Sequence, residues 1–311
     1  MSIRITVRDN QKRWKRSIDD MENISHIQSS IDILEEFRKA TLESNIVLDE
    51  IISGIHKSRC SGQNIEFLDY RDYVYGDDLR YIDWKLFARS DRFYIKRFDD
   101  NKRNKVYLLL DSTQSMNLGE GLFNKYFKAV LLATIMANIF SRFRDDVYLV
   151  SNSEMVKLGD AYGTPIIPTM MQVFSQQRFE STDFFSTYES ILEFLPKDSI
   201  LCVFSDLFSD VHRVTEKIKT VSGSGIYQYI FHTMDRSEWS PSVRGLRLFI
   251  DPDSGQEMII QADNIWEEYR EVLQKYISDI KDILISTKSG RYIQCLLDRD
   301  LREILLELFK R

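Results

Sequence analysis

The chain has 311 residues, of which 43% are hydrophobic, so it can bury a sizeable core in one large domain or two modest ones. Its formal net charge of −6 argues against a protein that binds duplex nucleic acid. The three cysteines are scattered, which is typical of a reducing compartment rather than of a disulfide framework. We find no signal peptide, and the longest apolar stretch, at about 129–140, is too short to span a bilayer. We therefore expect a soluble, cytoplasmic protein.

The N-terminal part, residues 1–52, predicts a helical extension. Hydrophobic residues recur at helical spacing from Ile24 to Phe37, which indicates one amphipathic helix. A cluster of Lys and Arg between Arg4 and Arg16 precedes it and is followed by acidic residues. We interpret that cluster as a solvated arm rather than a membrane-binding patch.

The next segment, residues 53–104, predicts turns and short strands, with a period-two alternation at 93–98 that indicates one strand. Arginines alternate with acidic and aromatic residues here, which fits internal guanidinium–carboxylate pairs better than a nucleic-acid surface. We expect Asp83 and Arg89 to be buried in such pairs. Binding of a partner by the exposed part of this segment stays an alternative. The arginines are Arg59, Arg71, Arg80, Arg89 and Arg92, and the acidic residues are Glu66, Asp69, Asp77, Asp78, Asp83 and Asp91.

The third part, residues 105–311, alternates between strands and helices. Apolar runs at 106–111, 146–151, 199–205 and 226–232 are separated by helical patterns, which predicts right-handed crossovers and a doubly wound, mostly parallel α/β sheet. A hairpin with its turn at Asp253-Ser254-Gly255, a long helix, a last strand and a last helix follow. The expected helices lie at about 123–143, before Arg178, at about 184–195, at about 210–221, at about 265–284 and from Asp298 onward.

The candidate site begins where the apolar run at 106–110 ends. Asp111, Thr113 and Ser115 form the pattern D-x-T-x-S, which places a carboxylate and two hydroxyls on one loop. Such hard oxygen donors suit Mg²⁺, Mn²⁺ or Ca²⁺ rather than zinc. A simpler alternative is that these hydroxyls only cap the next helix.

Two later positions extend this pattern. Thr182 lies in a polar loop that opens an amphipathic stretch, and Asp206 ends the apolar run at 200–205. With D-x-T-x-S, the order and spacing resemble the metal-ion-dependent adhesion site of von Willebrand factor A domains. Thr113 stands where that family usually has Ser, which keeps the oxygen donor. Helix capping is the alternative role for both Thr182 and Asp206. The resemblance implies Mg²⁺ or Mn²⁺, with Ca²⁺ less favoured, bound by Asp111, Thr113, Ser115, Thr182 and Asp206.

A denser signature precedes the candidate site. It reads S-G-I-H-K-S from Ser53, E-F-L-D-Y-R from Glu66, G-D-D-L-R-Y-I-D-W from Gly76 and A-R-S-D-R from Ala88. These motifs resemble the bacterial family catalogued as domain of unknown function 58, whose members carry them before a von Willebrand A-like core. The resemblance extends from about Ser53 to the C-terminus. The expected architecture is therefore a von Willebrand A-like α/β domain with the N-terminal helix and the charged segment packed on it.

The resemblance implies a non-enzymatic, metal-dependent protein-binding module. Members are associated with MoxR-type AAA+ ATPases in a chaperone-like or maturation role, so the expected partner is such an ATPase or a client protein. A partner carboxylate would fill the open coordination position of the metal. The alternatives are a metal-dependent hydrolase using the same carboxylates, for which no general base is identifiable, and an adaptor with a degenerate metal site.

Overall fold

The computed structural model describes residues 31–47, 67–72, 93–98, 103–119, 123–151, 154–159, 165–179 and 184–309. The chain divides into two compact units, one formed by residues 52–103 and the other by residues 1–51 with 104–311. In the smaller unit, β1 (Phe67–Asp72) pairs antiparallel with β2 (Tyr94–Phe98), the strand expected from the alternation at 93–98. Asp83 and Arg89 lie outside the described residues, so their ion pairs stay a prediction.

A six-stranded sheet forms the centre of the larger unit, in the order β10-β7-β6-β3-β4-β5. All neighbours are parallel except β4 and β5, so the expected doubly wound, mostly parallel α/β fold is confirmed. The edge strand β5 was not expected, because its largely exposed residues lack the apolar pattern of a central strand. The strands are β3 (Lys105–Leu110), β4 (Asp146–Ser151), β5 (Glu154–Leu158), β6 (Ile200–Ser205), β7 (Tyr227–Met234) and β10 (Gly290–Leu296).

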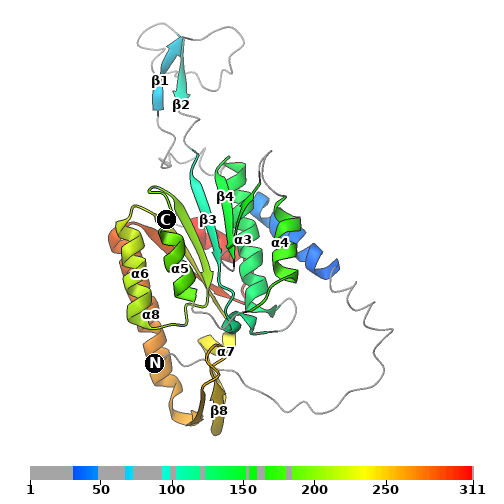
Figure 1. The fold of residues 1–311 in the computed structure, drawn as a ribbon, viewed down its shortest axis with the longest axis vertical. Coiled ribbons are helices and arrows are strands. Elements are labelled where there is room, and N and C mark those ends of the chain that lie inside the picture. Colours follow the sequence, from blue (N-terminus) through cyan, green and yellow to red (C-terminus); the bar gives the residue numbers. More distant parts are fainter. Residues whose placement is uncertain are drawn as a thin grey trace. The chain divides into compact units, whose positions relative to one another are not determined.

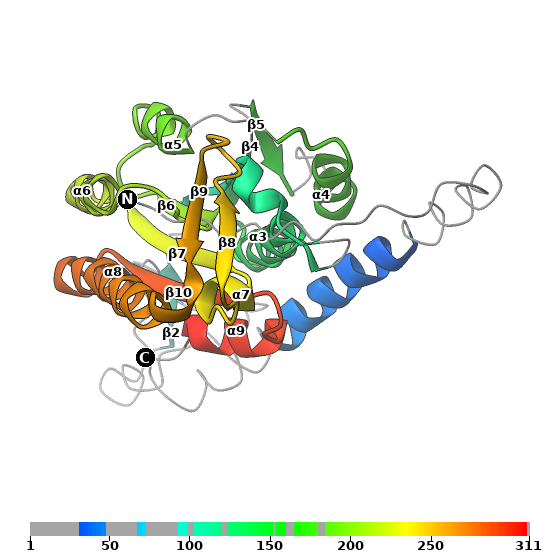
Figure 2. The same cartoon turned by 90° about the horizontal axis from the view of Figure 1, so that it is seen from below.

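Helices cover both faces of this sheet (Figures 1 and 2). The helix of residues 31–47, α3, α4 and α9 pack on one face, and α5, α6 and α8 pack on the other. The short helix α7 was not expected from the sequence. The helices are α3 (Lys125–Arg142), α4 (Ile166–Ser175), α5 (Phe184–Leu192), α6 (Val211–Gly223), α7 (Arg236–Trp239), α8 (Trp266–Thr287) and α9 (Leu301–Phe309).

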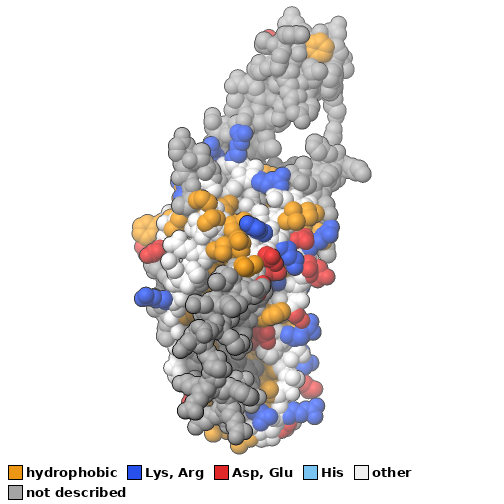
Figure 3. Space-filling view, turned by 90° about the vertical axis from the view of Figure 1, so that its right-hand side faces the viewer, with side chains coloured by type: hydrophobic (Ala, Val, Ile, Leu, Met, Phe, Trp, Pro, Cys, Tyr) orange, Lys and Arg blue, Asp and Glu red, His pale blue; other side chains and the backbone are white. Residues whose placement is uncertain are grey.

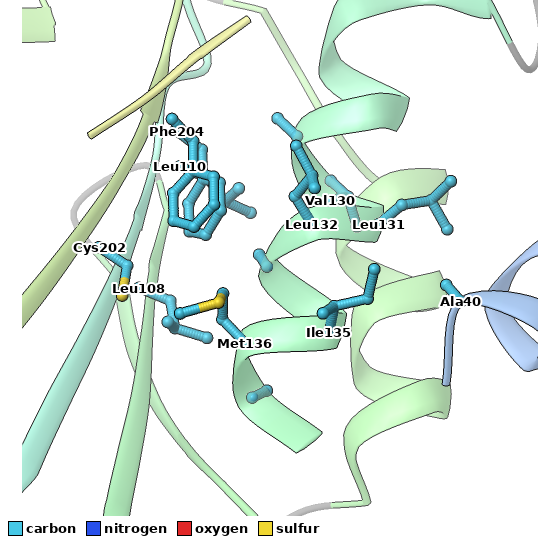
Figure 4. Close-up of a cluster of buried hydrophobic side chains, with 14 of the residues drawn as sticks. Ala40, Leu108, Leu110, Val130, Leu131, Leu132, Ile135, Met136, Cys202 and Phe204 are labelled. Atoms are coloured by element: carbon cyan, nitrogen blue, oxygen red, sulfur yellow. The ribbon is translucent and has the colours of Figure 1, made fainter. Parts of the chain in front are cut away.

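The central strands are buried on both faces, as their unbroken apolar runs predicted. In β3, Leu108 and Leu110 point into the core under α3, whereas Tyr107 and Leu109 point into the core under α5, α6 and α8. Figure 4 shows the first of these cores, where β3 and β6 face α3. Because successive side chains of a strand point to opposite faces, β3 contributes to both cores and its end is held firmly in place.

The N-terminal helix, residues 31–47, packs on the first core through a stripe that overlaps the predicted one at Phe37 and extends beyond it; Ile24 and Ile27 of the predicted stripe lie outside the described residues. Phe37, Ala40 and Val47 are fully buried, and the Phe37 ring meets the Phe127 ring of α3 edge-on at 5.9 Å. Ile31, expected on the apolar face, is 45% exposed. The buried stripe therefore continues toward residue 47 instead of ending at residue 37.

The expected two-stranded antiparallel hairpin, β8 (Leu246–Ile250) and β9 (Glu257–Gln261), is confirmed and follows α7. It packs on α8 through Phe249, whose ring lies 6.1 Å from that of Trp266. Figure 3 shows one face of the molecule, on which Lys and Arg side chains are interspersed with Asp and Glu side chains. Within the described parts of the chain, no helix is both long and apolar enough to cross a membrane.

Replacing Phe37 with Ala should lower the free energy of unfolding by about 3–5 kcal/mol, because the change removes a fully buried aromatic ring and leaves a cavity. Urea denaturation measures the loss. Leu42→Ala is the control on the same helix, since Leu42 is 60% exposed and should cost less than about 0.5 kcal/mol. Equal losses for the two variants would contradict the packing of this helix on the core.

Candidate metal site

The candidate site lies where the connections of the sheet change direction. From β3 the chain crosses to β4 on one side, whereas from β6 it crosses to β7 on the other, and β3 and β6 are direct neighbours. Open α/β sheets bind ligands at this switch point, beyond the carboxyl ends of the strands. Asp111 directly follows β3 and Asp206 directly follows β6, so both carboxylates emerge at this crevice.

Three of the predicted ligands form one hydrogen-bonded cluster. The backbone N and Oγ1 of Thr113 donate to Oδ1 of Asp111 at 2.9 and 2.8 Å. The Thr113 and Ser115 hydroxyls are 2.8 Å apart. All three residues are buried. The D-x-T-x-S loop therefore brings the carboxylate and the two hydroxyls into one hydrogen-bonded chain.

Helix capping does not explain these side chains. The short 3₁₀ helix η2 (Gln114–Asn117) has Thr113 at its N-cap without a side-chain cap bond, and α3 is capped by Asn124. The alternative role of Asp206 is wrong as well, because the N-cap of α6 is Asp210, which accepts from the backbone N of Arg213 at 3.0 Å.

A third hydroxyl, that of Ser205, belongs to this cluster and was missed from the sequence. Ser205, the last residue of β6, donates from Oγ to Oδ2 of Asp111 at 2.5 Å and accepts from the backbone N of Leu207 at 2.9 Å. Both carboxylate oxygens of Asp111 are thus engaged by hydroxyls. The available signal was a hydroxyl residue that ends an otherwise apolar strand, beside the strand that carries Asp111.

Asp206 is held by a buried lysine that the sequence did not single out. Nζ of Lys125, at the start of α3, lies 2.9 Å from Oδ2 of Asp206 and 2.8 Å from Oε1 of Glu238 in α7. All three side chains are buried. The second carboxylate oxygen of Glu238 accepts from the backbone N of Asp235 at 2.8 Å, which closes the capping box of α7. We call Lys125, Asp206 and Glu238 the buried triad.

Among the described residues, the buried charges at the carboxyl ends of β3 and β6 do not balance. Burial first and the nearby charge of Asp206 second raise the pKa of Asp111 to about 6, against the Ser205 and Thr113 hydrogen bonds, which lower it. Burial lowers the pKa of Lys125, but the Asp206 and Glu238 carboxylates outweigh that effect, so its pKa is raised and it stays an ammonium group. The three buried carboxylates of Asp111, Asp206 and Glu238 outnumber the one buried ammonium group of Lys125. When all three are ionised, the net charge is negative, which favours binding of a divalent cation.

The structure places four of the five predicted ligands. Asp111, Thr113 and Ser115 lie together, and Asp206 lies close enough to shift the pKa of Asp111. Thr182 lies outside the described residues. In the described parts of the chain, no three His, Cys, Asp or Glu residues form a group that could hold a metal. The candidate site therefore depends on hydroxyl donors, and this hard, all-oxygen set fits Mg²⁺ or Mn²⁺.

Removing the ammonium group with Lys125→Met should lower the free energy of unfolding by about 3–5 kcal/mol, because two buried carboxylates lose their counter-charge. Adding Glu238→Gln to that variant should restore part of the loss, since one of the stranded charges disappears. Chemical denaturation of the four combinations gives the coupling energy between the two positions. Additive losses would show that the two side chains do not interact.

Comparison with known proteins identifies the family but no activity. One solved structure that this chain matches is titled "Crystal structure of conserved hypothetical protein BatB from Bacteroides thetaiotaomicron", with a TM-score of 0.34, 11% identity, and coverage of 67% of this chain and 100% of that chain. No curated protein is significantly similar to this chain. The model of the family described as "Protein of unknown function DUF58" matches residues 69–277, more than half of the sequence. The chain therefore belongs to the DUF58 family.

Proposed function

We propose that this protein is a non-enzymatic binding module that uses a divalent metal to recognise a carboxylate of a partner protein. The observation that carries the proposal is the cluster at the switch point of the sheet, in which the Thr113 hydroxyl bonds to the buried Asp111 carboxylate and the Ser115 hydroxyl bonds to that of Thr113. Asp111, Thr113 and Ser115 would hold Mg²⁺ or Mn²⁺, with Thr182 and Asp206 completing the set. This proposed ligand set resembles that of a von Willebrand A-like site.

Coordination chemistry favours recognition over hydrolysis. Mg²⁺ prefers six oxygen ligands, so five donors from the chain leave one position for an external carboxylate. The partner we propose is a MoxR-type AAA+ ATPase or a client protein, met in the cytoplasm. Hydrolysis would need a general base beside Asp111. The described histidine near Asp206, His232, is fully buried and bonded through Nδ1 to the Tyr292 hydroxyl at 2.6 Å, and burial lowers its pKa to about 4.

One observation favours a second candidate, an adaptor whose metal site is degenerate. Lys125 already supplies a positive charge to Asp206 at 2.9 Å. In that case the buried triad would stabilise the sheet edge by itself, and partner binding would not depend on a metal. The two candidates differ in whether Mg²⁺ binds at Asp111.

Mg²⁺ should raise the melting temperature of the wild-type protein, and Asp111→Asn should abolish the rise while the fold stays intact without metal. A ligand at a hundredfold excess over its Kd stabilises the native state by about 2.7 kcal/mol, which amounts to a shift of several degrees. Differential scanning fluorimetry in the presence and absence of EDTA measures it. Asp282→Asn, which changes an exposed carboxylate on α8, is the matched control and should keep the full shift.

The Mg²⁺-dependent rise in melting temperature should also become smaller as the pH falls. Because the pKa of Asp111 is raised to about 6, a proton competes with the metal below that value, so the Mg²⁺-dependent rise should shrink between pH 7.5 and about pH 5. If Mg²⁺ raises the melting temperature of Asp111→Asn as much as that of the wild type, Asp111 is not a ligand of the metal. Absence of any rise in the wild type would favour the degenerate adaptor.

The affinity for the partner should depend on the hydroxyl groups of Thr113 and Ser115. Thr113→Ser keeps the oxygen donor and should bind a MoxR-type ATPase about as tightly as the wild type does. Thr113→Ala and Ser115→Ala each remove one donor without adding charge, and both should bind at least about tenfold more weakly, a loss of roughly 1.4 kcal/mol. Titration calorimetry with and without EDTA measures the series. Equal affinities for all four proteins would reject metal-mediated recognition.

A further inference from the structure

The tip of the β8–β9 hairpin is a well-defined turn that presents acidic residues. Its ends are joined by hydrogen bonds from the backbone N of Asp251 to the Gln256 carbonyl at 2.9 Å and from the backbone N of Gly255 to the Asp251 carbonyl at 2.8 Å. Gly255 has a φ of +69°, a conformation that favours glycine. The Asp251 carboxylate binds inside the turn, accepting from the backbone N of Asp253 at 3.1 Å and from the Ser254 hydroxyl at 2.6 Å.

The second carboxylate of this tip, that of Asp253, reaches the candidate metal site. Its Oδ1 accepts a hydrogen bond from the backbone N of Ser115 at 2.9 Å, across 138 positions of sequence. Ser115 is also a predicted ligand, with its hydroxyl 2.8 Å from that of Thr113. Figure 2 shows β8 and β9 in front of the central sheet. The chain itself therefore places a carboxylate against the loop that would hold the metal.

The hairpin can release this contact without disturbing the sheet. The inner face of the hairpin packs on α8 through Phe249. On its outer face, Leu246, Leu248 and Ile259 are 65%, 47% and 67% exposed. A two-stranded hairpin is marginally stable alone and depends on such packing. Phe249 pairs with Met258 one step from the turn, whereas Ala262 of the same buried cluster lies at the base of the hairpin, where its backbone N donates to the Gly245 carbonyl at 2.9 Å. Loss of the Asp253 contact at the tip leaves this packing at the base in place.

We propose that Asp253 is a built-in competitor of the partner's carboxylate. It holds, in cis, the position beside Ser115 that an external carboxylate would take when it binds the metal. A partner must therefore displace the hairpin tip, and the site selects carboxylates presented on a tight turn, as Asp253 is. This inference rests on the proposed metal-dependent recognition and adds the kind of ligand and a residue that limits its affinity. A tethered group acts at a millimolar effective concentration, so weak ligands are excluded.

The test uses the full chain and a labelled peptide with the sequence of the tip, Phe249–Glu257, at saturating Mg²⁺. Fluorescence anisotropy should show D253N binding this peptide about tenfold more tightly than the wild type does, equivalent to about 1.4 kcal/mol. The control variant E257Q removes an exposed carboxylate from the same hairpin and should bind as the wild type does. A peptide carrying the same D253N change should bind none of these proteins, and EDTA should abolish binding.

The melting temperature of each protein with and without Mg²⁺ distinguishes failure of this inference from failure of the proposed function. If Mg²⁺ stabilises the wild type and D253N alike, but D253N binds the peptide no better than the wild type does, the competitor role of Asp253 is overturned and the proposed function stands. If Mg²⁺ stabilises neither protein, the proposed function fails and this inference fails with it.

Discussion

The ion pairs of Lys125 are the interaction on which the candidate site depends. Its ammonium group lies 2.9 Å from Asp206 and 2.8 Å from Glu238, and all three side chains are buried. An unpaired buried carboxylate is strongly destabilising, so Asp206 can stay charged at the end of β6 only because Lys125 accompanies it. The charge of Asp206 in turn raises the pKa of Asp111. The charge of Asp206 therefore depends on one lysine at the first turn of α3.

The same triad connects the candidate site to the hairpin. Glu238 belongs to α7, which directly precedes the hairpin, and its carbonyl accepts from the Tyr269 hydroxyl of α8 at 2.9 Å. At its other end the hairpin returns to the site through Asp253 and the backbone N of Ser115. The segment between Asp206 and α8 thus contacts the candidate site at two places.

Several features were determined by the sequence alone, because local patterns carry them. The apolar runs ending at Leu110 and Ser205 predicted strands buried on both faces, and their alternation with helices predicted a parallel sheet. The D-x-T-x-S spacing predicted that the carboxylate of Asp111 and the hydroxyls of Thr113 and Ser115 would lie together on one loop. Each of these predictions concerns residues close together in the chain, or a period that repeats along it.

Other features were decided only by the tertiary structure. Lys125 meets Asp206 and Glu238 across 81 and 113 positions, and Ser205 meets Asp111 across 94. In the sequence, a lysine at the start of an apolar helix is expected in solvent, and a serine at a strand end is unremarkable. Asp253 looked like an ordinary turn residue, yet it reaches Ser115 from 138 positions away. No local pattern specifies such contacts, because they arise when the sheet order brings β3 and β6 together and folds the hairpin over their ends.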